Sequence, residues 1–327
     1  MNFIAEICQN HNGDLNKLLE MTNAAAESGA THIKIQHIYV KNLTFRPQFE
    51  NGLICNDITH AIKRPWLDEY SRLKSLELSL SDCDKFINAV IDSGLKPLTT
   101  CFSRSDIQTI YDLGFQEIKV ASYDCASYQL IRELTKKFKK IYVSTGASFD
   151  EEVKKTNEIL LKSKKEYELF HCVTIYPTPL NFMNLNRINW LKELSKNVGF
   201  SDHSHVGDNG VLAAKVALLY KINSIERHFT TLNASETKDG PVSIRPNHLK
   251  ELISFNALSE EDKLNSLKDE YPNWQELHGN KNYLLTKEEM LNRNYYRGRF
   301  ASPIKNQSIN NPTNYFIYNW EETPLCQ

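Results

Sequence analysis

The feature that most constrains the fold of this chain is a repeated alternation of short apolar runs with longer amphipathic segments. Each run is bounded by Gly, Asn, Ser or Thr and is followed by a segment with helical periodicity. The runs are FIAEI (3–7), HIKIQ (32–36), PLTTC (97–101), EIKVAS (117–122), IYVST (141–145), YELFHC (167–172), NVGFSD (197–202) and SIERHF (224–229). We expect the helices near 15–28, 82–93, 104–113, 127–137, 150–163, 186–195, 208–220 and 246–257. Eight strand–helix units in about 255 residues predict an α/β fold of the (β/α)8 (TIM) barrel class.

The pattern changes near residue 260, which sets the expected domain boundary. Residues 1–260 are predicted to form the catalytic barrel, and 261–327 a C-terminal extension. The extension begins polar with modest helical spacing and ends rich in Asn and Pro. We expect it to wrap the barrel or to meet a partner chain.

Composition and charge exclude several classes of protein. The 327 residues hold 39 basic and 40 acidic side chains, a formal net charge of -1, so the chain has no overall electrostatic signature of nucleic-acid or membrane binding. The N-terminus lacks the features of a signal peptide, and no apolar run approaches the ~18 residues of a membrane span. We therefore expect a cytoplasmic protein. The 7 cysteines are odd in number and never spaced C-x-x-C, which favours reduced thiols.

Polar side chains lie where the chemistry of such a barrel is found, at the carboxyl ends of the strands. Lys34 and Lys119 are the most informative. One lysine alone would often extend along the surface to solvent, but both faces of barrel strands are covered, and an unpaired buried ammonium costs several kcal/mol or shifts its pKa. An anionic ligand would explain both lysines, with a phosphate or carboxylate cradle completed by hydroxyls of Thr100, Ser122 and Ser201.

Two histidines end adjacent strands of the predicted barrel. His203 and His228 can converge there on a divalent metal, or each can be satisfied by hydrogen bonds to Asp202 or Glu226. With Glu6 as a third or water-mediated group, two imidazoles leave an open coordination sphere, as a catalytic ion requires. His171 is expected to be a core or supporting residue, and His205 a loop residue without a role.

The motifs AEICQNHNGD, KIQ, TTCFSR, IKVAS, VSTG, HCVTIYPTP, GFSDHS and ERHFT together resemble the N-acetylneuraminate (sialic acid) synthase family, which includes the legionaminate and pseudaminate synthases. The match spans about residues 3–257. The resemblance implies an enzyme that condenses phosphoenolpyruvate with the open-chain aldehyde of an N-acylated hexosamine. Its products are a nine-carbon 2-keto-3-deoxy acid and phosphate. It also implies a divalent ion, manganese or magnesium, and a homodimer.

The same resemblance assigns site residues. His203 and His228 would hold the metal, with Glu6 beside it to orient or deprotonate the attacking water. The phosphate and carboxylate of phosphoenolpyruvate would be held by Lys34, Thr100, Lys119, Ser122 and Ser201. The sugar would be faced by Gln36, Asp124, Tyr176 and Asp239.

Two departures from the family pattern affect these assignments. Thr174 stands where better-known members carry an Asn that contacts phosphoenolpyruvate. The family also ends in an antifreeze-like domain that supplies an arginine to the sugar of the partner, and we expect this chain to lack most of it. Arg297 or Arg299 is the expected substitute.

Other interpretations stay open at this point. The barrel could be a metal-dependent aldolase or isomerase that does not use phosphoenolpyruvate, or a non-catalytic binding or assembly subunit. Retention of Glu6, both lysines and both histidines argues against the subunit, because a scaffold has no physical need for such costly groups together. The segment 37–81 either covers the site or packs on the barrel rim.

Overall fold

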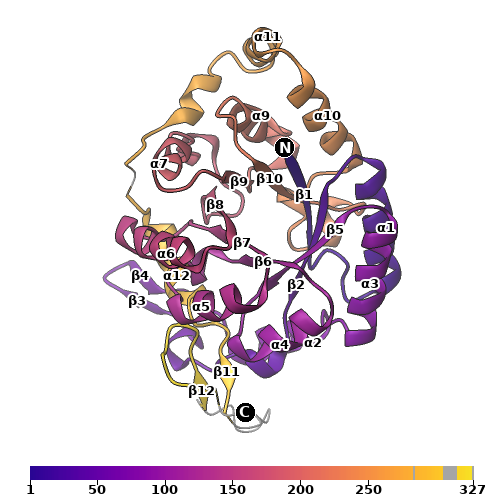
Figure 1. The fold of residues 1–327 in the computed structure, drawn as a ribbon. Coiled ribbons are helices and arrows are strands. Elements are labelled where there is room, and N and C mark those ends of the chain that lie inside the picture. Colours follow the sequence, from indigo (N-terminus) through magenta and orange to yellow (C-terminus); the bar gives the residue numbers. More distant parts are fainter. Residues whose placement is uncertain (283, 305–314, 326–327) are drawn as a thin grey trace.

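A closed barrel of eight parallel strands forms the centre of the protein (Figure 1). The computed structural model describes residues 1–282, 284–304 and 315–325. Around the barrel the strands follow the order β1-β10-β9-β8-β7-β6-β5-β2. Their bounds are β1 (Asn2–Cys8), β2 (His32–His37), β5 (Lys96–Cys101), β6 (Glu117–Val120), β7 (Lys140–Ser144), β8 (Glu166–Cys172), β9 (Val198–Asp202) and β10 (Ser224–His228). The predicted (β/α)8 barrel is confirmed.

Helices connect the strands and cover the outside of the barrel (Figure 1). They are α1 (Leu15–Glu27), α3 (Leu80–Asp92), α4 (Ile107–Asp112), α5 (Tyr128–Lys137), α6 (Asp150–Ser163), α7 (Arg187–Leu194), α9 (Leu212–Leu218) and α10 (Pro246–Ala257). Two predicted helices differ in detail. The one expected at 104–113 begins with a 3-10 turn, Arg104–Asp106. The one expected at 208–220 is divided into α8 (Val206–Asn209) and α9, because Gly210 has a φ of +52° and interrupts the helical backbone.

Helix α3 shows how the local sequence fixes one of these elements. Ser79 caps its N-terminus in a reciprocal capping box with Asp82, a contact worth about 1 kcal/mol. One face then buries Cys83, Phe86, Ile87 and Val90. The helical spacing of these apolar side chains anchors the helix to the barrel wall.

The barrel interior holds an apolar layer between two polar ends. Ile4, Leu98, Tyr142 and Phe170 form a fully buried cluster there. Gly199 makes room for it, since a Cβ at this position would lie 2.6 Å from the Phe170 ring. The apolar layer separates the amino ends of the strands from the carboxyl ends.

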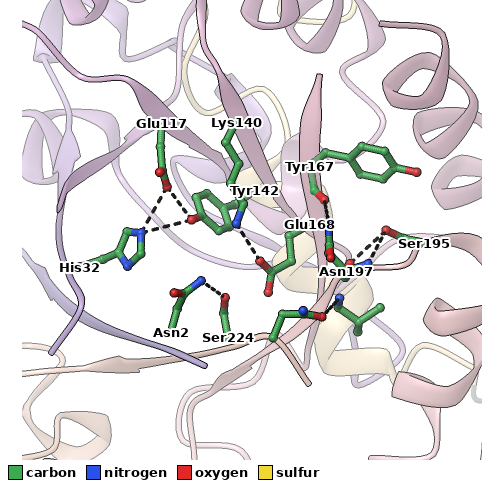
Figure 2. A network of polar contacts seen from close by, with 12 residues as sticks. Asn2, His32, Glu117, Lys140, Tyr142, Tyr167, Glu168, Ser195, Asn197 and Ser224 are labelled. Carbon is green, nitrogen blue, oxygen red and sulfur yellow. Dashed lines mark hydrogen bonds and ion pairs between the residues drawn. The ribbon is translucent and has the colours of Figure 1, made fainter. Parts of the chain in front are cut away.

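The amino ends of the strands carry a network of polar contacts (Figure 2). Glu117 accepts a hydrogen bond of 2.6 Å from Tyr142 and lies 3.2 Å from His32 Nε2. Burial alone would raise the pKa of Glu117, but hydrogen bonds from His32, Lys96 and Tyr142 outweigh it and hold the pKa below its ordinary value. Polar groups at this end of a barrel serve stability, and we assign the network that role.

Two segments outside the repeating pattern pack against each other. The first, 37–81, forms short 3-10 turns, a hairpin of β3 (Leu53–Cys55) and β4 (Ile58–Ala61), and helix α2 (Trp66–Lys74). The second contains α11 (Glu260–Glu270), α12 (Lys287–Tyr296), β11 (Ser302–Pro303) and β12 (Phe316–Ile317). The Ala301 amide donates to the Asn42 carbonyl at 2.9 Å, and the Phe49 and Tyr295 rings meet edge to face at 5.1 Å.

Helix α12 also contacts the loop after β8 and the first turn of α6. Asn292 donates to the Thr174 carbonyl at 2.9 Å, and Arg293 forms an ion pair of 2.6 Å with Glu152. That residues 261–327 form a unit distinct from the barrel stays a prediction. Among the described residues, no helix has the length and apolarity needed to span a membrane, and the six described cysteines are free, Cys326 lying outside these residues.

Candidate active site at the carboxyl ends of the barrel strands

Lys34 and Lys119, predicted from the sequence to meet at the barrel mouth, converge on one carboxylate. Lys119 Nζ lies 3.2 Å and Lys34 Nζ 3.7 Å from Glu226 Oε2. Ser201 donates to the other oxygen of Glu226 at 2.8 Å, and Glu6 pairs with Lys34. All five side chains are buried. The register explains the grouping, because Glu6 is paired with Lys34 on β2 and with His228 on β10.

The charges of this cluster compensate one another in a buried setting. Burial would raise the pKa of Glu226, but Lys119, Lys34 and Ser201 hold it well below its ordinary value, so the carboxylate stays ionised. Burial lowers the pKa of Lys34 to about 8, against the opposing effect of Glu226. Sequence reasoning gave Glu226 no role of its own at the anion site. Its position two residues before His228, on the same face of the strand, was the available signal.

The remaining predicted anion ligands lie on neighbouring strand ends. Thr100 on β5 is in register with both Gln36 and Lys119. Ser122 opens a 3-10 turn after β6, and its hydroxyl would lie 3.0 Å from a Cβ at Gly146. Because Gly146 has no side chain, the Ser122 hydroxyl can lie this close to the Gly146 backbone.

Asp124 has partners of a different kind. Its Oδ1 accepts from Ser127 at 2.7 Å and from Asn319 at 3.0 Å, and Asn319 belongs to the C-terminal extension. Burial raises the pKa of Asp124, although the hydrogen bonds from Ser127 and Asn319 oppose this increase. These contacts give Asp124 a structural role in fastening the extension, and its contact with a sugar stays a prediction.

The two predicted metal-binding histidines lie side by side. The ring centroids of His203 and His228 are 5.2 Å apart, and Tyr176 lies 4.3 Å from His203. Burial lowers the pKa of both imidazoles, further in the case of His203, so both rings are neutral at pH 7. Nδ1 of His228 has no hydrogen-bond partner among the described residues. A neutral, buried imidazole with an unused nitrogen fits a metal ligand.

One group of side chains has the spacing of metal ligands within the described part of the chain. Ligand atoms of Cys8, His228 and Asp239 all lie within 4.8 Å of one another. His203 is not in this group, and neither is Glu6, so their roles toward a metal stay predictions. Cys8 was missed by the sequence reasoning, although it follows Glu6 by two positions and ends the same strand. A thiol, an imidazole and a carboxylate together suit a divalent ion.

Comparison with known proteins now identifies the family. A sequence profile described as the NeuB family matches residues 21–263. The chain belongs to the NeuB family. It is 29% identical over 257 residues to an N,N'-diacetyllegionaminic acid synthase of Campylobacter jejuni, covering 77% of this chain and 74% of that protein. A pseudaminic acid synthase of the same species is 29% identical over 252 residues, covering 76% and 71%.

A solved structure agrees on the fold. The N-acetylneuraminic acid (sialic acid) synthetase of Leptospira borgpetersenii, crystallised with citrate, superposes with a TM-score of 0.67 at 22% identity. The superposition covers 83% of this chain and 92% of that one. The superposition supports the fold, while the profile match and the two relatives confirm the resemblance inferred from the motifs.

Three residues mark the departures of this NeuB family member from the expected pattern, and each makes contacts with other residues of the chain. Thr174 is buried, and its carbonyl accepts a hydrogen bond of 2.9 Å from Asn292. Arg297 lies 3.4 Å from Glu152, with its guanidinium 5.2 Å from the Trp320 ring. Arg299 is buried and paired with Glu69. That either arginine contacts a sugar stays a prediction.

His171, expected to be a core residue, gives a pH-dependence of stability. It is 1% exposed, donates to the Met183 carbonyl at 2.7 Å and stacks on Phe200. Burial lowers its pKa from 6.5 to about 4. Above pH 6.5 the ring is neutral whether the chain is folded or not. Below it only the unfolded chain takes up the proton, so stability falls until about pH 4, by roughly 3 kcal/mol.

Urea unfolding measured between pH 7 and 4 checks this expectation. His171→Gln keeps a donor for Met183 but does not titrate. Its unfolding free energy should therefore fall with pH less steeply than that of the natural protein, by up to roughly 3 kcal/mol over the range. Parallel curves for the two proteins would contradict the assignment.

Proposed function

We propose that the protein condenses phosphoenolpyruvate with the open-chain aldehyde of an (N-acyl)hexosamine-type sugar. The products are a nonulosonic 2-keto-3-deoxy sugar acid and phosphate. The observation that carries the proposal is the convergence of two buried lysines from separate strands, beside two neutral histidines, at the carboxyl ends of the barrel. Relatives named as legionaminic and pseudaminic acid synthases support the same enzyme class.

The lysines and hydroxyls bind the anionic substrate. Lys34 and Lys119 neutralise the phosphate and carboxylate of phosphoenolpyruvate, and Thr100, Ser122 and Ser201 donate hydrogen bonds to the same oxygens. Before substrate arrives, Glu6 and Glu226 hold the two ammonium groups in place. Fixed charges in a buried site need little reorganisation during the reaction and stabilise its transition state.

Four polar side chains face the sugar. Gln36, Asp124, Tyr176 and Asp239 orient it so that its aldehyde carbon faces C3 of phosphoenolpyruvate. His203 and His228 would hold a divalent ion, manganese or magnesium, which would supply Lewis-acid chemistry at the sugar aldehyde.

Glu6 acts in the second half of the reaction. Formation of the carbon–carbon bond leaves positive character at C2, which water attacks before phosphate leaves. Glu6 is buried between Lys34 and Cys8 and accepts a hydrogen bond of 2.6 Å from the Cys8 amide, which fixes its carboxylate. A fixed carboxylate can orient or deprotonate that water. We further expect the protein to work as a homodimer, as implied by its family.

Phosphate release tests the proposal. We expect phosphate from phosphoenolpyruvate with manganese in the presence of one acceptor among N-acetylmannosamine, diacetamido-trideoxyhexoses and non-acylated aldoses. The variant His228→Ala should lose metal-dependent turnover, because the ion would lose a ligand. No phosphate release together with no binding of phosphoenolpyruvate at millimolar concentration would reject the synthase.

A further inference from the structure

We infer that Cys8 is a thiolate ligand of the divalent ion at the barrel mouth, alongside His228 and Asp239. The inference rests on the proposed function in one respect, that a divalent ion works in this site. It adds a sulfur ligand to a site expected from the sequence to be built on two imidazoles. The chemistry of the ion changes with that ligand.

The distances between the candidate ligand atoms suit one small ion. Cys8 Sγ lies 3.1 Å from Asp239 Oδ2, and His228 Nδ1 lies 3.8 Å from the same oxygen. A tetrahedral ion with bonds of ~2.3 Å to sulfur and ~2.1 Å to nitrogen and oxygen separates its ligand atoms by roughly 3.4–3.6 Å. The sulfur–oxygen separation is shorter than this range and the nitrogen–oxygen separation is longer, so shifts of up to about half an ångström would bring both into it.

The protein does not supply hydrogen-bond partners for all polar atoms of this group. His228 is 7% exposed, and its Nδ1 has no hydrogen-bond partner among the described residues. The Cys8 thiol, also buried, donates its proton to Asp239. The unpartnered Nδ1 of His228 therefore faces a carboxylate that accepts a hydrogen bond from the Cys8 thiol. An ion in place of that proton would satisfy all three atoms.

The backbone at Cys8 is unusual for a residue with a side chain. Its φ is +54°, a left-handed conformation that glycine adopts freely and other residues rarely do. The pairing of β1 with β2 shifts register between Glu6 and Cys8, as at a β-bulge. Such irregularities redirect side chains next to active sites. A strained position next to the catalytic cluster that nevertheless carries a thiol points to a use for the sulfur.

Coordination by Cys8 has defined chemical consequences. The thiol loses its proton to the buffer as the sulfur–metal bond forms, with no change in oxidation state. Thiolate favours softer ions. The affinity of the site for Co²⁺, Fe²⁺ and Zn²⁺ relative to Mg²⁺ should therefore exceed that of a site made of imidazole and oxygen alone. The site would then prefer a transition metal.

Optical titration of the full-length protein with Co²⁺ tests the inference directly. We expect a sulfur-to-cobalt charge-transfer band in the near ultraviolet. Cys8→Gly, which suits the left-handed backbone and should fold, must lack the band, as must Cys8→Ser. Cys83→Ala, which removes a buried thiol from α3, is the matched control and must keep it. Absence of the band from the natural protein, or its persistence in Cys8→Gly, would overturn the inference.

Binding measurements supply a second readout. Loss of the sulfur should weaken the binding of Co²⁺ or Zn²⁺ by at least about 100-fold, because loss of even a residue that only supports a ligand lowers metal affinity by about 10–100-fold. The binding of Mg²⁺ should weaken much less. Calorimetry in buffers of different ionisation enthalpy should show one proton fewer released by Cys8→Ser. Equal affinities and proton release in both proteins would refute the thiolate.

The two proposals fail separately in these experiments. Metal-dependent phosphate release without the cobalt band would leave the synthase intact and reject Cys8 as a ligand. The band without phosphate release from any acceptor would support the metal site and count against the synthase.

Discussion

Replacing Lys119 with Met is expected to lower kcat/KM for phosphate release by about 10²–10³-fold, the range seen when a fixed group that stabilises transition-state charge is removed. Lys119 lies 3.2 Å from Glu226 and directly over the Phe170 ring, at 3.5 Å from its centroid. Without it, the buried carboxylates of Glu6 and Glu226 face a single ammonium, that of Lys34. The natural cluster is neutral, whereas the variant would carry a net negative charge and repel the trianionic substrate.

Steady-state kinetics with phosphoenolpyruvate measure this effect, with thermal melting as a check that the variant is folded. The matched control is Lys96→Met. Lys96 also pairs with a glutamate, Glu117, at 2.8 Å, but it lies at the amino end of the barrel and is largely exposed. Replacing Lys96 should leave kcat/KM within a few-fold of the natural value. A folded Lys119→Met variant with natural kcat/KM would remove this lysine from the site.

Breaking the ion pair of Arg227 and Asp202 is expected to produce the largest loss of stability. Arg227 is 1% exposed and Asp202 fully buried. Besides Asp202, the guanidinium donates to the Ser204 hydroxyl at 2.9 Å and to the Val242 carbonyl at 3.3 Å. Arg227→Met leaves the Asp202 carboxylate uncompensated in the interior, which costs about 3–5 kcal/mol. The loops after β9 and β10, which carry His203 and Asp239, would also lose their common anchor.

Urea unfolding monitored by fluorescence measures this loss. The double variant Asp202→Leu/Arg227→Met removes both charges and should recover much of the stability, because no isolated buried charge remains. Arg132→Met is the surface control. Arg132 pairs with Glu322 at 3.5 Å, and both side chains are exposed, so its unfolding free energy should hardly change. A similar small effect for Arg227→Met would show that the buried pair is not needed.

The sequence by itself determined the barrel and the end of the barrel at which the chemistry lies. Parallel strands covered on both faces must be short and apolar, so the alternation with helices was visible without any tertiary contact. Against that background Lys34, Lys119, His203 and His228 stood out, because apolar strands do not carry such residues without a reason. Their position at strand ends placed them at one face of the barrel.

Only the tertiary structure decided which atoms meet. Asp239 lies 231 residues from Cys8 in the chain, in a loop whose path depends on contacts such as that of Arg227 with Val242. The same holds for Glu226, which accepts from Lys119 across the barrel, and for Asp124, which is tied to Asn319. Residue periodicity records which face of a strand or helix is buried. It does not record register shifts, loop conformations or side-chain pairings, because these depend on residues distant in the sequence.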